Sequence, residues 1–254
     1  SYIVDILDFG VTSSGVPFMA MDYISGVSLK QAVKTLGLLN TDTVIEIIKK
    51  VCIGLGYAHK QGVFHRDIKP ENIILVLDKH AELSIKIIDF GIARVTGNTG
   101  KQQDYRGHSL VGTPSYISPD SARGKKFTSS SEVYSLGCVL FELLTGRPPF
   151  LKDEVLQVMH AHVNEKAPLL NEVSDIEYSA ELESLVSRCL EKDSNSRFET
   201  MEELLTALDS LDSYLLEQEI DYDLFVGEED LETEEDASSR HTSSIGNDQG
   251  NLVL

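Results

Sequence analysis

The sequence predicts an α+β fold in which a few short strands are combined with a mainly helical body. Runs rich in β-branched residues lie near the N-terminus and again at 73–77 and 83–88. Apolar residues recur every three and four positions in 41–60, the spacing of an amphipathic helix. With 254 residues, 41% of them apolar, the chain is long enough for one well-cored domain or two small ones.

The elements follow one another in a clear order. The first 24 residues predict two strands around a turn at 13–15. Ser28 is placed to cap a short helix over 29–36, and the longer helix over 41–60 follows. Further helices are expected at 132–145, 153–163, 179–192 and 200–216.

The formal net charge of −19 is unevenly distributed. Residues 199–254 hold 17 acidic residues against a single base, Arg240, while the rest of the chain is nearly neutral. The stretch 217–254 therefore predicts an acidic, disordered tail or linker. Because no basic face is available to neutralise phosphates, nucleic acid is not an expected partner.

No apolar run approaches the ~18 residues that a membrane-spanning helix needs. The chain lacks a secretory signal, and it also lacks an initiator Met, which indicates a start within a longer protein. Cys52, Cys138 and Cys189 lie among apolar residues and predict buried reduced thiols. Together these features favour a cytoplasmic location, although the full-length protein could be anchored in a membrane.

The most informative stretch is the polar run His65–Asn72, which lies directly before a predicted strand. The next strand ends in Asp89-Phe90-Gly91. Two neighbouring strands, each flanked by a polar loop, can bring Asp67 and Asn72 close to the second aspartate. These oxygen-bearing side chains, with Lys69 nearby, suit a site for a metal ion and a phosphate group.

The pattern H-R-D-x-x-x-x-N followed by D-F-G is the catalytic signature of protein kinases, and this sequence resembles that family over residues 1–212. The loop has the serine/threonine form, and 18–29 resembles the bacterial receptor-like kinases. The resemblance implies transfer of the γ-phosphate of ATP, with Mg²⁺, to Ser/Thr hydroxyls of protein substrates. A regulatory domain beyond either end of the chain is also expected.

The resemblance implies a role for each catalytic residue. Asp67 would accept or orient the proton of the substrate hydroxyl, and Lys69 would offset developing negative charge on the phosphoryl group. Thr113 would hydrogen-bond toward both of these side chains. Asn72 and Asp89 would hold Mg²⁺.

The same resemblance implies an adenine site at the end of the N-terminal strands. Met21 would be the gatekeeper residue, and the backbone of Asp22 and Ile24 would contact adenine. Ile74 would form part of the apolar floor beneath the base, although a plain core position fits it equally well. Asp89 would bridge the metal ion and the phosphates.

Two further expectations concern an activation loop and a buried ion pair. The polar stretch 92–112 matches the family's activation loop, and Arg66 would pair with a phosphate on it; the candidate acceptors are Thr96, Thr99 and Ser109. The family's Ala-Pro-Glu triplet is replaced here by Ser-Pro-Asp, so Asp120 is expected to pair with Arg197.

A second departure from the family pattern affects the catalytic loop, His65–Asn72, directly. Glu132 stands where the family carries an aspartate that fastens the backbone of this loop. A longer carboxylate can still bond that backbone, but the local geometry must adjust. We therefore expect the activity to be reduced rather than abolished.

No G-x-G-x-x-G loop and no V-A-I-K strand occur in the chain. We therefore expect the first three strands and the following helix of the small lobe to be absent. The predicted fold is mainly the helical large lobe, with the hinge and the last small-lobe strands. In this division, 1–24 is the remnant of the small lobe and hinge, 25–216 is the large lobe, and 217–254 is the tail.

Two other functions compete with a working kinase. A catalytically impaired, kinase-like binding or regulatory module is favoured by Glu132 and by the missing motifs. A small-molecule phosphotransferase of related fold would share the catalytic Asp and Asn. The segment 112–120 and Arg197 argue against that last function, because in the family they bind and support a protein substrate.

Overall fold

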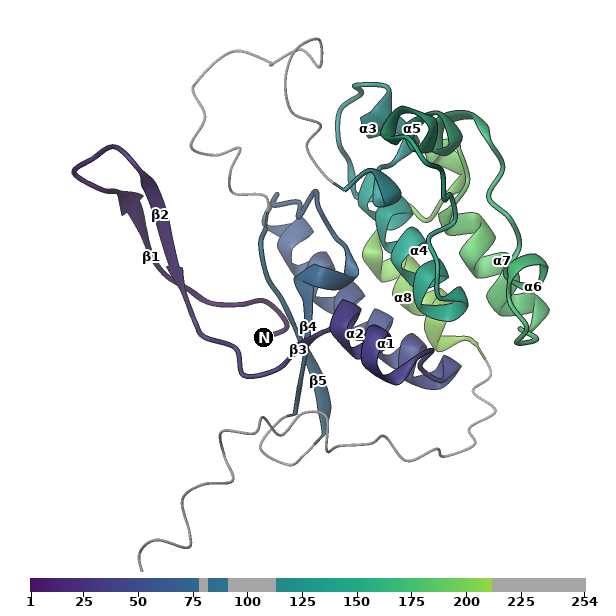
Figure 1. Ribbon diagram of the computed structural model, residues 1–254, viewed down its shortest axis with the longest axis horizontal. Coiled ribbons are helices and arrows are strands. Elements are labelled where there is room, and N and C mark those ends of the chain that lie inside the picture. Colours follow the sequence, from purple (N-terminus) through teal and green to yellow (C-terminus); the bar gives the residue numbers. More distant parts are fainter. Residues whose placement is uncertain (78–81, 91–112, 212–254) are drawn as a thin grey trace, which may run out of the picture. The chain divides into compact units, whose positions relative to one another are not determined.

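The computed structural model describes residues 1–77, 82–90 and 113–211. These ranges form two small antiparallel sheets and a set of helices (Figure 1). The predicted acidic tail and the predicted activation loop with Thr96, Thr99 and Ser109 lie outside the described residues.

The first sheet is a hairpin of β1 (Ile6–Val11) and β2 (Pro17–Met21). Its turn is closed by a 2.8 Å hydrogen bond from the Thr12 amide to the Val16 carbonyl. Gly15 has φ 82°, a conformation that glycine adopts without strain. This hairpin confirms the two strands that were predicted for the first 24 residues.

The second sheet joins β3 (Val27–Ser28), β4 (Ile73–Leu77) and β5 (Leu83–Ile87) in that spatial order. Its two outer strands flank β4, which follows the catalytic loop directly. At Gly26, a Cβ atom would lie 2.3 Å from the Leu75 carbonyl oxygen. Only glycine therefore allows the chain before β3 to approach β4 so closely.

The helices are α1 (Leu29–Leu36), α2 (Thr41–Lys60), α3 (Pro119–Ala122), α4 (Ser129–Thr145), α5 (Val155–Asn164), α6 (Leu170–Val173), α7 (Ala180–Cys189) and α8 (Met201–Asp209). The predicted helices over 29–36 and 41–60 are confirmed with the same bounds. The Ser28 hydroxyl caps the first of them by accepting from the Gln31 amide. The last helix ends at Asp209, earlier than predicted.

Helix α4 is the centre of the core. All fifteen residues from Ser130 to Leu144 are buried, and α2, α3, α6, α7 and α8 contact this helix. Thr128 caps its start, and Gly146, at φ 77°, ends it. A helix that is buried on every side gives a fixed platform for the polar groups that extend from it.

The expected absence of the N-terminal elements is wrong. The chain forms β1 and β2, then β3, β4 and β5, together with helix α2. The prediction rested on two missing motifs, the glycine-rich loop and the strand lysine. Strand formation depends on backbone pairing and side-chain alternation, so a missing motif does not determine whether strands form.

Two other expectations concern membrane-spanning helices and the state of the cysteines. Among the described ranges, we find no helix that combines the length and the apolar character required to cross a bilayer. Cys52, Cys138 and Cys189 are all buried free thiols, as predicted. Burial raises the pKa of each thiol, because a thiolate would lose its hydration in the core.

Candidate active site

The catalytic loop leaves α2 through a turn at Gly62, which has φ 74°. It then passes through Arg66, a non-glycine residue at φ 70°. An arginine in this left-handed conformation is strained, at a cost of roughly 1–2 kcal/mol. Such a conformation persists only where surrounding contacts fix the backbone.

Glu132 provides those contacts from α4. Its fully buried carboxylate accepts hydrogen bonds from the amides of His65 at 3.2 Å and Arg66 at 2.6 Å. His59 Nε2 lies 2.5 Å from the same carboxylate, and its Nδ1 lies 3.0 Å from the Ser129 hydroxyl. The longer carboxylate therefore still fastens the loop, as the sequence allowed.

Asp67 lies at the centre of the loop with both carboxylate oxygens engaged. Lys69 Nζ donates to Oδ2 at 2.7 Å, and the Thr113 amide donates to Oδ1 at 3.1 Å. Lys69 also reaches the Thr113 hydroxyl at 3.2 Å. The structure thus brings these three residues together although Thr113 is distant in sequence.

Asn72 and Asp89 are brought together by the backbone. The Ile88 amide donates to the Asn72 carbonyl at 3.0 Å, which places Asp89 one residue beyond this contact. Asn72 Nδ2 donates to the Asp67 carbonyl at 2.9 Å, so the side-chain oxygen is directed away from that bond. Asp89 is exposed, and its backbone has φ 58°. One amide oxygen and one exposed carboxylate are ligands that Mg²⁺ accepts.

His65 links the loop before Asn72 to the segment around Asp89. Its Nε2 lies 2.8 Å from the Ile88 carbonyl, and its ring centroid lies 4.7 Å from that of Phe90. Burial lowers the pKa of His65, with Glu132 opposing that shift. A neutral imidazole that donates to the carbonyl fits this position.

The residues predicted to bind adenine lie at the end of the hairpin and on β4. Met21 ends β2, and the Asp22 amide donates to the Asp5 carbonyl at 3.0 Å. This leaves the Asp22 carbonyl free of described partners, and the Ile24 amide likewise has none. Ile74 is half-buried on β4.

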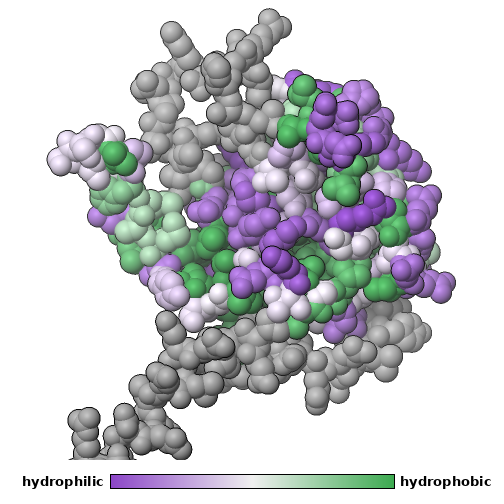
Figure 2. All heavy atoms as spheres, in the orientation of Figure 1, coloured by the Kyte–Doolittle hydropathy of each residue, from purple (hydrophilic) through white to green (hydrophobic). Residues whose placement is uncertain are grey.

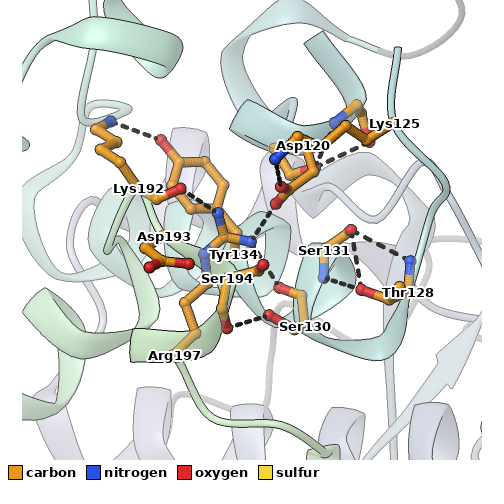
Figure 3. A network of polar contacts seen from close by, with 12 residues as sticks. Asp120, Lys125, Thr128, Ser130, Ser131, Tyr134, Lys192, Asp193, Ser194 and Arg197 are labelled. Carbon is orange, nitrogen blue, oxygen red and sulfur yellow. Dashed lines mark hydrogen bonds and ion pairs between the residues drawn. The ribbon is translucent and has the colours of Figure 1, made fainter. Parts of the chain in front are cut away.

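The predicted ion pair between Asp120 and Arg197 is confirmed. Arg197 is 2% exposed, and its Nη1 donates to Asp120 Oδ2 at 2.9 Å (Figure 3). The same guanidinium also donates to the carbonyls of Ser130, Glu191 and Lys192. The buried guanidinium therefore has three backbone acceptors in addition to the Asp120 carboxylate.

A buried aromatic cluster lies next to this pair. Tyr134 Oη accepts from Lys192 at 3.1 Å and lies 2.8 Å from His162 Nδ1. Burial lowers the pKa of Lys192 to about 8 and that of His162 to about 3. Within the described ranges no hydrogen-bond partner meets the geometric criteria at the buried His162 Nε2. The Ser115 backbone raises the pKa of His162 and so opposes the effect of burial.

Sequence reasoning missed one network beneath the segment that contains Tyr116. Glu142 on α4 accepts from the Tyr116 hydroxyl and, at 2.7 Å, from Lys30 on α1. Burial and the Glu142 hydrogen bond raise the pKa of Tyr116 well above its usual value. Lys30 and Glu142 are 112 positions apart, so no local pattern indicates the contact.

Comparisons with known proteins show the family to which the chain belongs. The model of the protein kinase domain family matches residues 1–207. Serine/threonine-protein kinase PknB of Mycolicibacterium smegmatis is 38% identical over 205 residues, which are 80% of this chain and 32% of that protein. Serine/threonine-protein kinase pkn3 of Myxococcus xanthus is 34% identical over 82% of this chain and 39% of its own length.

Solved structures give the same result. The kinase domain of Mycobacterium tuberculosis PknI superposes with a TM-score of 0.62 at 26% identity, covering 82% of this chain and 71% of that one. The chain therefore belongs to the protein kinase family, and it is a serine/threonine kinase domain of the bacterial type by this similarity. It spans about a third of the length of the curated relatives.

The match to the family begins at residue 1. The expectation of a domain without its N-terminal strands and helix is therefore not supported by the comparisons, in agreement with the strands observed in the structure.

Proposed function

We propose that this domain transfers the γ-phosphate of ATP to serine or threonine hydroxyls of protein substrates. The observation that carries the proposal is the arrangement of Asp67, Lys69 and Thr113, which are linked by hydrogen bonds of 2.7–3.2 Å. A carboxylate and an ammonium that are fixed side by side suit proton acceptance from a hydroxyl and stabilisation of a phosphoryl group.

In this mechanism, Asp67 accepts the hydroxyl proton as the substrate oxygen forms its bond to the γ-phosphorus and the bond to ADP breaks. Lys69 donates to the carboxylate and stabilises negative charge on the transferred group. Thr113 holds the carboxylate through its amide. Preorganisation of this kind lowers the barrier because the groups need not reorient during the reaction.

Asn72 and Asp89 fit a magnesium site, through the side-chain amide oxygen of one and the exposed carboxylate of the other. When bound, Mg²⁺ would neutralise charge on the ATP phosphates. The Asp22 carbonyl and the Ile24 amide supply an acceptor and a donor for the adenine edge, with Met21 and Ile74 beside them as apolar contacts.

We further propose that the protein substrate binds along the segment that follows Thr113. Tyr116 in the turn η3 (Pro114–Tyr116) is fixed from below by Glu142, which gives this segment a rigid base. We also favour a reducing compartment such as the cytoplasm for this domain, because Cys52, Cys138 and Cys189 are unpaired thiols.

The test is phosphate transfer from Mg-ATP to casein, measured with the wild-type chain and with Asp67→Asn. We expect the substitution to lower the rate by about 10²–10⁴-fold, because the proton acceptor is lost. Asp175→Asn is the matched control, since Asp175 is an exposed acid outside the site, and its rate should equal that of the wild type.

Two outcomes would contradict the proposal. An Asp67→Asn variant as active as the wild type would refute the role of Asp67. Tight binding of ATP and casein without any transfer by the wild type would instead support a binding module.

A further inference from the structure

A cavity of about 240 Å³ opens directly beside the catalytic carboxylate. Its walls come from the catalytic loop, from the segment around η3, and from the loop between α3 and α4. Lining side chains that matter here are Arg66, Asp67, Thr113, Lys125, Lys126 and Phe127. A group bound in this cavity would therefore lie next to the position of the acceptor hydroxyl.

The charged side chains of the cavity wall are partly neutralised by one another and by near neighbours. Asp67 is paired with Lys69 at 2.7 Å. Lys125 is paired with Asp120 at 3.6 Å, although Asp120 is also held by Arg197. These contacts account for one acid and one base on the wall.

Two cations are left over, Arg66 and Lys126. Neither forms an ion pair with any carboxylate in the parts of the chain that the structure describes. Both side chains are exposed. The cavity therefore has an excess of positive charge, even though the chain as a whole carries −19.

The fold also fixes where one of these cations lies. The Arg66 amide bonds to Glu132 at 2.6 Å, which holds its backbone at φ 70°. Its guanidinium carbon lies 5.9 Å from the centroid of the Phe127 ring, within the range of a cation–π contact. Arg66 thus lines the cavity in a defined orientation.

We propose that this cavity is a substrate subsite for an acidic side chain, whose carboxylate binds between Arg66 and Lys126. The proposal rests on the proposed kinase function and names a class of substrate for it. The cations would make charge-assisted hydrogen bonds to the carboxylate. Phe64, Ile117 and Phe127 also line the cavity and would pack against the methylene groups of a glutamate.

The acid would lie close to the acceptor in sequence. Asp67 and Thr113 line the same cavity, and an extended peptide advances about 3.3 Å per residue. An acidic residue within a few positions of the serine or threonine can therefore reach the two cations.

The experiment compares peptides that are identical except for Glu or Gln at each position within three residues of the acceptor serine. For the wild-type chain, at least one Glu peptide should show a KM about three- to tenfold below that of its Gln partner, because its carboxylate pairs with Arg66 and Lys126. Added salt should reduce this ratio, because it screens the exposed charges.

Lys126→Glu should largely remove the difference between the two KM values, because the introduced carboxylate offsets the positive charge of Arg66. Lys166→Glu is the matched control, because it makes the same change of charge at an exposed lysine outside this cavity, and it should leave the ratio of KM values unchanged. A ratio that Lys126→Glu does not alter, or an equal KM for every Glu and Gln pair, would overturn the proposal.

A phosphate on the chain itself is the other anion that could pair with these cations. The variant in which Thr96, Thr99 and Ser109 are all alanine separates the two sources. A preference for Glu that persists in this variant supports the substrate subsite. Loss of the preference would show that the chain's own phosphate creates it, and would overturn the proposal.

Binding measurements distinguish failure of the subsite from failure of the kinase function. Fluorescence anisotropy of labelled Glu and Gln peptides requires no phosphate transfer. If transfer fails but the Glu peptide still binds the wild-type chain more tightly, the subsite is supported and the kinase function is not. Equal binding of both peptides together with measurable transfer would overturn the subsite alone.

Discussion

The β1–β2 hairpin and helix α4 show opposite ways of building structure from one chain. Along the hairpin, Phe9 is 73% exposed and Leu7 is 66% exposed, and Figure 2 shows apolar, green side chains over this part of the surface. In α4, fifteen consecutive residues are buried, including Glu132. The hairpin is held mainly by its own backbone pairing, whereas α4 is held by the whole domain.

This difference determines what each region can do. Polar groups on α4 fix distant segments: Glu132 holds the catalytic loop, and Glu142 holds Tyr116 in η3. The hairpin presents Asp22 and Ile24 with only a few contacts to the rest of the described chain. We therefore expect substitutions around α4 to have large effects and substitutions on the hairpin to have small ones.

The largest loss of stability is expected for Arg197→Met, which removes one partner of a buried pair. Asp120 would keep only the exposed Lys125, and three backbone carbonyls would lose a donor. The free energy of unfolding should fall by about 3–5 kcal/mol, as measured by urea denaturation. Arg188→Met, the same change in an exposed pair with Glu203, should cost less than about 1 kcal/mol.

A similar loss of unfolding free energy for both arginine variants would show that the buried network contributes no more to stability than an exposed ion pair. It would contradict the view that α4 and its neighbours hold the domain together.

A smaller effect is expected when the pH falls. Burial lowers the pKa of His162 from its ordinary 6.5 to about 3. Between these values the unfolded chain binds more protons at this residue, so stability that is present above pH 6.5 is lost as the pH falls toward 3. By pH 5 this residue alone should remove about 2 kcal/mol.

The measurement is urea unfolding at pH 7 and pH 5 for the wild type and for His162→Asn. Asparagine does not titrate and can still accept from the Tyr134 hydroxyl. The variant should be less stable at pH 7 but should lose about 2 kcal/mol less between the two pH values. An equal loss in both proteins would exclude His162 as the source.

The smallest effect is expected on the hairpin. Phe9→Ser replaces a side chain that is 73% exposed and leaves the backbone pairing with Met19 intact. The free energy of unfolding should change by less than about 0.5 kcal/mol. A loss above 2 kcal/mol would mean that the hairpin is as tightly coupled to the core as α4.

The sequence predicted those features that depend on local pattern or on a family motif. The helices over 29–36 and 41–60 follow from capping residues and apolar spacing, and both are confirmed. The pair of Asp120 and Arg197 was predicted because each lies in a motif that the family shares.

Features that depend on distant contacts were missed. His59 was placed on a helix without a role, yet it contacts Glu132, 73 positions away. Lys30 likewise meets Glu142 only through the packing of α1 against the core. The N-terminal elements were wrongly expected to be absent because motifs, rather than strand pairing, decided that prediction.

Hydrogen exchange of the backbone amides measures whether Glu132 fastens the catalytic loop to α4. In Glu132→Gln, the side-chain amide group can accept only through one oxygen and turns a donor toward a backbone amide. Exchange of the His65 and Arg66 amides should become at least about tenfold faster relative to amides within α4, because roughly one charge-assisted hydrogen bond is lost. The hairpin amides should be unchanged. Unaltered exchange at His65 and Arg66 would contradict the claim.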